Sequence, residues 1–186
     1  MKTEKEKMLA GELYNAMDPV LYEERIRAKE LLFDYNHTRP SERETRERIL
    51  RELLGSTGNE FLIEQPFNCD YGYNIHIGEN FYANVGCTIL DVAPVTIGDN
   101  VMLAPNVNIY TAGHPLDAGV RNSGLEYAYP VNIGNNVWIG GNVTIVPGVA
   151  IGDNTVIGAG SVVTKDIPAN VVAVGNPCRM VREIPK

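Results

Sequence analysis

The chain has 186 residues, of which 44% are hydrophobic, and its formal net charge at pH 7 is −7. A chain of this length and composition can bury one sizeable core, so we predict a globular protein with one domain, or one domain plus a small appendage. The acidic balance argues against a nucleic-acid or anionic membrane partner, because both need clustered positive charge. A small-molecule partner fits better.

The first residues, MKTEKEKMLAGELY, are too interrupted by charge to form the apolar segment of a signal peptide. No run in the chain approaches the ~20 apolar residues of a membrane span, so we expect a cytoplasmic protein without membrane contact. The three cysteines, Cys69, Cys87 and Cys178, are odd in number and lack metal-ligand spacing. We expect them to be small buried side chains outside any disulfide framework.

Residues 1–54 carry 11 of the 16 Lys and Arg residues and 12 of the 23 Asp and Glu residues, with apolar side chains at helical spacing. We therefore predict helices here, in a cap segment over residues 1–58. Three helix-start signals are present, namely the capping-box pairs Thr3 with Glu6 and Ser41 with Glu44, and the Asp18-Pro19 pair. Gly55 is predicted to end the last helix.

From about residue 60 the charge thins and a six-residue repeat begins. Aliphatic side chains recur at Ile133, Ile139, Ile145, Ile151, Ile157 and Val163, and earlier at Ile77, Ala83, Ile89, Ile97, Leu103 and Ile109. Each unit of such a repeat makes a short strand and a turn, three units form a triangular coil, and stacked coils bury the aliphatic column. Strands of a β-sandwich recur every 8 to 12 residues or so, so we predict a solenoid over residues 59–164.

The repeat is interrupted over residues 110–130 by a loop rich in Gly, Pro and Asn. Long loops on rigid scaffolds often carry function. This loop holds His114 between a glycine and a proline, which constrain the backbone on both sides and would orient the imidazole for proton transfer. His37 lies near a predicted helix end and His76 in a strand-like unit, so we expect both to be structural. His114 is the candidate general base.

Asn84 occupies the position after an aliphatic residue, where glycine or another small residue is usual in this chain. The residues alone favour a turn-stabilising asparagine, and a substrate-positioning one is the alternative. The sequence contains no H-E-x-x-H, paired-cysteine, G-x-S-x-G or Walker-type motif, and two histidines in the repeat region are too few for a three-histidine zinc site within one chain. We expect no metal.

Segments along essentially the whole chain resemble the maltose and galactoside O-acetyltransferases, a family of hexapeptide-repeat acyltransferases. They are EKEKMLAGELYNA near the start, YGYNIHIGENFYAN (71–84), IGDNVMLAPNV (97–107), YTAGHP (110–115), IGNNVWIGGNVTIVPGVAIGDN (133–154), GAGSVVTKDIP (158–168) and GNPCRMVREI (175–184). The resemblance implies a mainly β fold, a left-handed parallel β-helix with an N-terminal α-helical cap. It also implies a homotrimer with intersubunit active sites and acetyl transfer from acetyl-CoA to a sugar hydroxyl.

By this resemblance, the family's catalytic histidine falls on His114 and its substrate-positioning asparagine on Asn84. The residues that would line the acceptor pocket are Arg25, Asp70, Tyr82 and Asn84. The residues that would contact coenzyme A are Trp138, Gly141, Ala159, Thr164, Lys165, Arg179 and Arg182. The three basic residues of this set all lie in a C-terminal tail, residues 165–186, that would contact coenzyme A. We place the oxyanion at the backbone N–H of Gly141. Asp117, Glu126 or a backbone carbonyl near residue 126 could orient the imidazole.

The chain also departs from its relatives. The galactoside enzymes carry serine where this chain has Asp70, and aspartate where it has Val92 beside Asp91. These differences favour maltose or glucose over a galactoside. A family acidic pocket residue is matched by Ala16, so we transfer no role there. The alternatives are another acceptor, such as an amine antibiotic, serine or a galactoside, and a non-catalytic solenoid scaffold. A γ-type carbonic anhydrase is disfavoured by the missing histidines.

Overall fold

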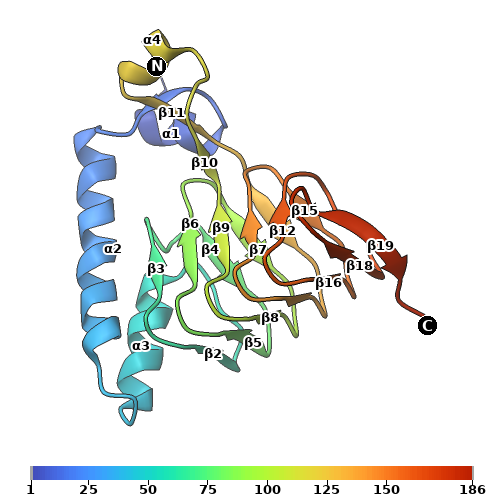
Figure 1. Ribbon diagram of the computed structural model, residues 1–186. Coiled ribbons are helices and arrows are strands. Elements are labelled where there is room, and N and C mark those ends of the chain that lie inside the picture. Colours follow the sequence, from blue (N-terminus) through green and yellow to red (C-terminus); the bar gives the residue numbers. More distant parts are fainter. Residues whose placement is uncertain (1, 186) are drawn as a thin grey trace.

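The computed structural model describes residues 2–185, in which a helical segment is followed by a stack of short strands (Figure 1). Helix α1 (Glu4–Leu9) begins at Thr3, which forms the predicted capping box with Glu6. Helix α2 (Pro19–His37) begins at Asp18, whose carboxylate accepts two backbone N–H groups of the first turn. Both start signals are confirmed. No helix among the described residues combines the length and apolar composition needed to cross a bilayer.

Helix α3 (Arg43–Leu53) starts differently from the prediction. The capping box predicted for Ser41 and Glu44 is wrong, because the residue that precedes the helix is Glu42 and its side chain makes no capping hydrogen bond. The Glu42 carboxylate accepts instead from the backbone N–H of Arg39, and the Glu42 N–H donates to the Arg39 carbonyl. This tight turn moves the helix start past Ser41.

The α2–α3 hairpin packs against the first coils of the solenoid (Figure 1). Gly55 follows the end of α3 as predicted, and it must be small, because a Cβ atom there would lie 2.2 Å from the carbonyl oxygen of Tyr73. Leu50, Leu53 and Ile63 are buried in one apolar cluster that continues into the solenoid. The helices therefore cover the first end of the core.

Strands in three parallel sheets form the three faces of the solenoid. The first face contains β4 (Ile75–Ile77), β7 (Val95–Ile97), β12 (Val131–Ile133) and β15 (Ala150–Ile151). The second face contains β2 (Phe61–Ile63), β5 (Phe81–Ala83), β8 (Met102–Leu103), β13 (Trp138–Ile139), β16 (Val156–Ile157) and β18 (Val171–Val174). The third face contains β3 (Asn68–Cys69), β6 (Thr88–Leu90), β9 (Asn108–Tyr110), β14 (Thr144–Ile145) and β17 (Val162–Val163).

Side chains of the six-residue repeat fill the interior. Every aliphatic residue predicted for the column is buried, and the column is in register between coils, as in the pairs of Leu103 with Ile139 and Ile139 with Ile157. Intervening side chains such as Met102 and Trp138 point outward, as the alternation of a strand requires. The predicted left-handed parallel β-helix with an N-terminal helical cap is the fold of this chain.

A ladder of asparagines turns the chain at one corner of successive coils. Its members, Asn80, Asn100, Asn136, Asn154 and Asn170, have left-handed backbones with φ between 55° and 61°. The Nδ2 group of each donates to the Oδ1 atom of the next over 3.0–3.2 Å. Asparagine tolerates this φ better than other residues with side chains, and stacked amides satisfy one another. The ladder therefore fixes both the turn and the coil spacing.

The solenoid extends beyond its predicted end at residue 164. Ile167 forms a parallel bridge with Ile151, and β18 pairs in parallel with β16, so one further coil follows. Strand β19 (Arg179–Glu183) then folds back antiparallel on β18. Strand β19 covers the exposed edge of the second face. The tail that we predicted from residue 165 therefore begins only after Val174, where the last coil ends.

The loop over residues 110–130 projects from the solenoid toward the N-terminal cap (Figure 1). It contains β10 (Ala112–Gly113), the short helix α4 (Ala118–Asn122) and β11 (Leu125–Ala128). Strand β11 pairs antiparallel with β10 and with β1 (Tyr14–Asn15) of the cap. The interruption of the repeat is thus an ordered subdomain held by the chain's first residues.

Replacing Asn136 by alanine is expected to lower the free energy of unfolding by about 2 kcal/mol. The variant loses two ladder hydrogen bonds and places an alanine in a left-handed conformation, and each effect contributes about 1 kcal/mol. Urea unfolding measures the change. Asn136→Gly is the matched control, since glycine accepts this φ freely and should show about half the loss. Equal losses in both variants would contradict a role for backbone strain.

Candidate functional site

His114 lies just after β10, and its side chain is 59% exposed. The carboxylate of Glu126, on the paired strand β11, lies 4.0 Å from the imidazole Nδ1 atom. The hydroxyl of Tyr14, which is opposite Glu126 in the β1–β11 register, donates to the same carboxylate over 2.8 Å. Asp117, the other carboxylate considered, accepts the N–H of Val120 and caps α4. Glu126 is therefore the carboxylate that faces the imidazole.

Tyr14 is a fixed donor in this arrangement. Burial, together with the hydrogen bond to Glu126, raises the pKa of Tyr14 above its usual value. The phenol therefore keeps its proton and holds the carboxylate in place. Sequence reasoning missed Tyr14, although it lies within the N-terminal segment that carried the family resemblance.

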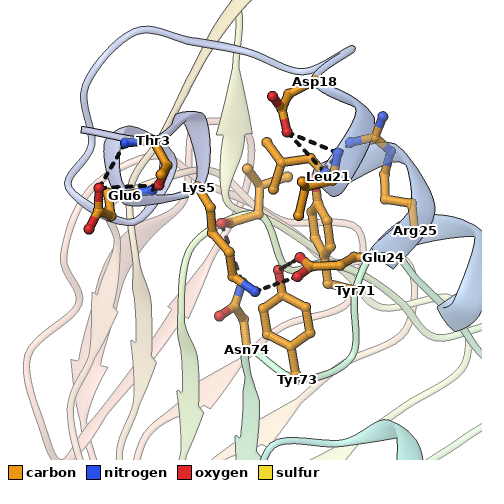
Figure 2. A network of polar contacts seen from close by, with 12 residues as sticks. Thr3, Lys5, Glu6, Asp18, Leu21, Glu24, Arg25, Tyr71, Tyr73 and Asn74 are labelled. Atoms are coloured by element: carbon orange, nitrogen blue, oxygen red, sulfur yellow. Dashed lines mark hydrogen bonds and ion pairs between the residues drawn. The ribbon is translucent and has the colours of Figure 1, made fainter. Parts of the chain in front are cut away.

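Arg25 lies on α2, and its guanidinium group joins the helical cap to the solenoid. Its Nη1 donates to the Tyr71 hydroxyl over 2.7 Å, and its Nη2 donates to the carbonyl of Ala16 over 2.7 Å. Figure 2 labels the side chains of Arg25 and Tyr71. Burial raises the pKa of Asp70, while the positive charge of Arg25 opposes that shift and the Glu126 carboxylate adds to it. Two residues predicted to bind the acceptor, Arg25 and Asp70, thus lie near Glu126.

A second polar group joins the cap to the solenoid beneath Arg25 (Figure 2). The Glu24 carboxylate accepts from Lys5 Nζ and from the Tyr73 hydroxyl, each over 2.7 Å. Lys5 also lies over the Tyr73 ring, 4.3 Å from its centroid. Burial and the Glu24 carboxylate raise the pKa of Tyr73, which stays a donor. These contacts hold α1 and α2 in place, and with them Arg25.

Asp91 is fully buried and organises the turn that carries Asp70. Its Oδ1 atom accepts the backbone N–H groups of Asp70 and Tyr71 over 3.0 and 2.8 Å, and its Oδ2 atom accepts that of Asn74 over 3.3 Å. Burial raises the pKa of Asp91 to about 6, although these hydrogen bonds oppose the shift. Sequence reasoning noted Asp91 only as a neighbour of Val92 and gave it no role.

Asn84 lies at the corner between the second and third faces. Its backbone N–H donates to the Leu103 carbonyl of the next coil, and its Oδ1 atom accepts from its own neighbour Val85, which fixes the amide. Gly141 lies further along this corner and accepts the N–H of Gly160, the residue after Ala159. Three residues predicted to handle substrates, Asn84, Gly141 and Ala159, therefore share one edge of the solenoid.

An apolar row runs along the outside of the second face. Its members follow one another in register, as Leu62, Tyr82, Met102, Trp138, Val156 and Val172. Trp138 is 51% exposed, and β19, with Arg179 and Arg182, borders the far end of the same sheet. A contiguous exposed apolar row of this kind is typical of a ligand or protein contact.

The predicted site residues fall on two opposite edges of the third face. His114 lies on the edge with Asp70, and Thr164 and Lys165 follow β17 on that same edge. Asn84 lies on the other edge, because it precedes β6 whereas Asp91 follows it. Trp138 lies on the neighbouring second face, past the edge that carries Asn84. Within one chain, strands therefore separate His114 from Asn84.

The remaining histidines and the cysteines have structural surroundings. His37 Nδ1 lies 2.8 Å from the carbonyl oxygen of Phe33, and His76 Nδ1 lies 3.0 Å from the Ser56 hydroxyl. The cysteines Cys69, Cys87 and Cys178 are unpaired and buried. Within residues 2–185, no three His, Cys, Asp or Glu side chains group closely enough to hold a metal ion.

Two family models match the chain. The maltose acetyltransferase hexapeptide capping motif matches residues 7–58, and the bacterial transferase hexapeptide (six repeats) matches residues 130–165. The galactoside O-acetyltransferase of Escherichia coli (strain K12) is 54% identical over 179 residues, which cover 96% of this chain and 88% of that protein.

Solved structures match over the full length. The crystal structure of a maltose O-acetyltransferase from Clostridium difficile 630 has 62% sequence identity and a TM-score of 0.98, and the match covers 100% of this chain and 99% of that one. A galactoside acetyltransferase in complex with coenzyme A has 52% identity and a TM-score of 0.96, with 100% and 92% of the two chains covered.

Replacing Asp91 by alanine is expected to lower the free energy of unfolding by about 3 kcal/mol, because three N–H groups, two of them buried and one partly buried, lose their acceptor. Thermal unfolding at pH 7 measures the loss. Asp91→Asn keeps an acceptor for two of these groups, so we expect a smaller loss. An unchanged melting temperature in the alanine variant would contradict this role.

The pH dependence of stability gives a second readout of Asp91. Its native pKa, about 6, lies above the usual 3.8, so the native state binds this proton more tightly than the unfolded chain. The contribution of Asp91 to stability therefore falls as pH rises from about 4 to 6. Asp91→Asn removes that part of the pH dependence.

Proposed function

The chain belongs to the maltose and galactoside O-acetyltransferase family, and we propose that it transfers an acetyl group from acetyl-CoA to a hydroxyl of maltose, glucose or a related sugar. Membership makes it an acetyltransferase and sets aside the scaffold alternative. The observation that carries the proposal is the exposed His114 imidazole, which the Glu126 carboxylate faces on the edge of the solenoid that also carries Asp70.

His114 acts as the general base in a direct transfer. It removes the proton from the sugar hydroxyl as that oxygen attacks the thioester carbonyl, and the backbone N–H of Gly141 stabilises the oxyanion. The attack completes the new C–O bond and gives a tetrahedral intermediate. This intermediate collapses when the carbonyl re-forms and the C–S bond breaks, and His114 gives its proton to the departing coenzyme A sulfur. Glu126, held by Tyr14, keeps the imidazole oriented and stabilises its charged form.

The acceptor pocket forms around Arg25, Asp70, Tyr82 and Asn84. Asp70 accepts hydrogen bonds from sugar hydroxyls, and Arg25, held by Tyr71 and Ala16, is already oriented before the sugar binds. The Val92 side chain is buried in an apolar cluster and offers no polar group where the galactoside enzymes carry aspartate. The presence of Asp70 in place of serine and of Val92 in place of aspartate supports a maltose or glucose acceptor over a galactoside.

Acetyl-CoA binds along the corner that carries Gly141 and Ala159. Gly141 is partly exposed and has no side chain, so its backbone is accessible to the pantetheine arm. Lys165, Arg179 and Arg182 supply positive charge for the phosphates. Trp138 and Thr164 complete the predicted set. The coenzyme A complex of the galactoside acetyltransferase supports this assignment.

Active sites form between subunits of a homotrimer. The His114 edge of one subunit meets the Asn84 edge of the next, which brings together groups that strands separate within a chain. The exposed apolar row around Trp138 lies beside the Asn84 edge and supports contact there. A closed ring of three such contacts leaves no edge unpaired.

Replacing His114 by alanine is expected to lower kcat about 10²- to 10⁴-fold, the usual contribution of general-base catalysis, with unchanged affinity for coenzyme A. Thiol release from acetyl-CoA is measured with glucose, maltose, galactosides, serine and aminoglycosides, and coenzyme A binding by calorimetry. Near-normal turnover in the variant would reject His114 as the base. Activity with serine or aminoglycosides alone would reject the sugar acceptor.

Two matched variants separate the loop carboxylates. Glu126→Gln still accepts from Tyr14 but loses the charge that faces the imidazole, so we expect a loss of kcat smaller than that of His114→Ala. Asp117→Asn retains an acceptor for the helix cap and should keep the full rate. The reverse order of effects would assign the orienting role to Asp117.

Mixing two inactive variants tests the intersubunit site. His114→Ala and Asn84→Ala subunits, dissociated and reassembled together in equal amounts, should recover about a quarter of wild-type activity, because about one interface in four combines two intact edges. Each variant reassembled alone is the control. Sedimentation shows whether trimers form. Reassembled trimers without recovered activity would place both residues in the same subunit's site.

A further inference from the structure

A cavity of about 520 Å³ lies away from His114, at the capped end of the solenoid. It is bounded on one side by α3 and the end of α2, and on the other by β2 and its flanking residues. The lining side chains that matter for its chemistry are Tyr35, Arg43, Arg46, Glu60, Phe61 and Glu64. None of them was assigned a role in acetyl transfer.

Arg46 forms a rigid polar part of the cavity wall. It is 8% exposed, and its Nη2 donates to the Ile63 carbonyl over 3.1 Å and to the Tyr35 hydroxyl over 3.3 Å. Its Nε atom is buried without a hydrogen-bond partner among the described residues. The two hydrogen bonds of Nη2 therefore fix the guanidinium group in the cavity wall.

The charges around the cavity nearly balance. Glu64 lies 3.5 Å from Arg46 and its side chain is partly exposed. Arg43, Glu47 and Glu60 also line the cavity, which gives two basic and three acidic side chains in all. Acidic groups on the wall disfavour a phosphate or another anion. A neutral polyhydroxylated ligand matches better, since its hydroxyls donate to carboxylates and accept from guanidinium groups. Phe61 adds an apolar surface of the kind that sugar rings pack against.

The cavity adjoins the residues proposed to bind the acceptor. Strand β2 is in register with β5, so that Leu62 lies beside Tyr82, and the Glu64 N–H donates to the Ala83 carbonyl over 2.8 Å. Glu64 and Asn84 thus follow two neighbouring strands, whose backbones lie about 4.8 Å apart. This separation is comparable to the length of one sugar ring.

We propose that this cavity is a second carbohydrate subsite, which binds a glycosyl unit of an oligosaccharide acceptor next to the unit that is acetylated. The inference rests on the proposed sugar acceptor. It makes short maltose-type oligosaccharides better acceptors than glucose, because only they reach both Asn84 and Glu64. The subsite lowers KM for the longer acceptors and leaves the chemistry at His114 unchanged.

The test compares kcat/KM for glucose, maltose and maltotriose. In the wild-type protein we expect kcat/KM to rise with acceptor length. Glu64→Gln should lower kcat/KM for maltose and maltotriose about 5- to 10-fold, through KM, and leave glucose unchanged, since one hydrogen bond to a charged group is lost. Glu44→Gln, an exposed change on α3 outside the cavity, is the matched control and should behave as wild type.

Two further measurements keep the outcome decisive. Arg43→Gln removes a second lining charge from the exposed surface of α3 and should reproduce the length-dependent loss if Glu64→Gln fails to fold. Calorimetric titration with maltotriose reports binding even if no sugar is acetylated, which separates this inference from the proposed function. Equal losses for all three acceptors, or maltotriose binding unchanged in both variants, would overturn the subsite.

Discussion

Everything in this molecule depends on the parallel hydrogen bonding of one coil to the next, with the aliphatic column held in register beneath it. The N–H of Asn84 donates to Leu103, that of Ala104 to Ile139 and that of Gly140 to Ile157, so one corner is a continuous column of backbone bonds. A slip of one residue would turn the buried aliphatic side chains outward. The same register that buries the core therefore sets the spacing between Asn84 and Gly141 along the proposed substrate path.

The helical cap is more than an end cover, because it contributes to the site at two points. Strand β1 brings Tyr14 to Glu126, and α2 brings Arg25 to Tyr71. The Asp91 carboxylate accepts backbone N–H groups of the turn between Asp70 and Asn74 and fixes that turn. Burying the charged carboxylate costs free energy, which its raised pKa reflects. The loop that carries His114 is thus held by the cap and the solenoid together, which keeps a projecting element in one geometry.

Local and periodic features could be predicted from the sequence, and long-range pairings could not. The aliphatic column and the helix starts at Thr3 and Asp18 depend on neighbours a few residues away, and all are confirmed. The Ser41 start was wrong because a turn at Arg39 competes with it. The Tyr14–Glu126 contact joins residues 112 positions apart, and no local spacing signals it. For Asp91, the missing information was its complete burial.

The proposed trimer gives a physical reason why two side chains, those of His114 and Trp138, are exposed in a single chain. A general base and an oxyanion donor work best where water is excluded, yet the His114 side chain is 59% exposed. Trp138, on the second face, is 51% exposed within an apolar row. In the proposed trimer, the Asn84 edge of one subunit covers the His114 loop of the next. This single contact buries the apolar row around Trp138 and excludes water from the active site. Association and catalysis then depend on the same surfaces, so a change that weakens the interface should also weaken transfer.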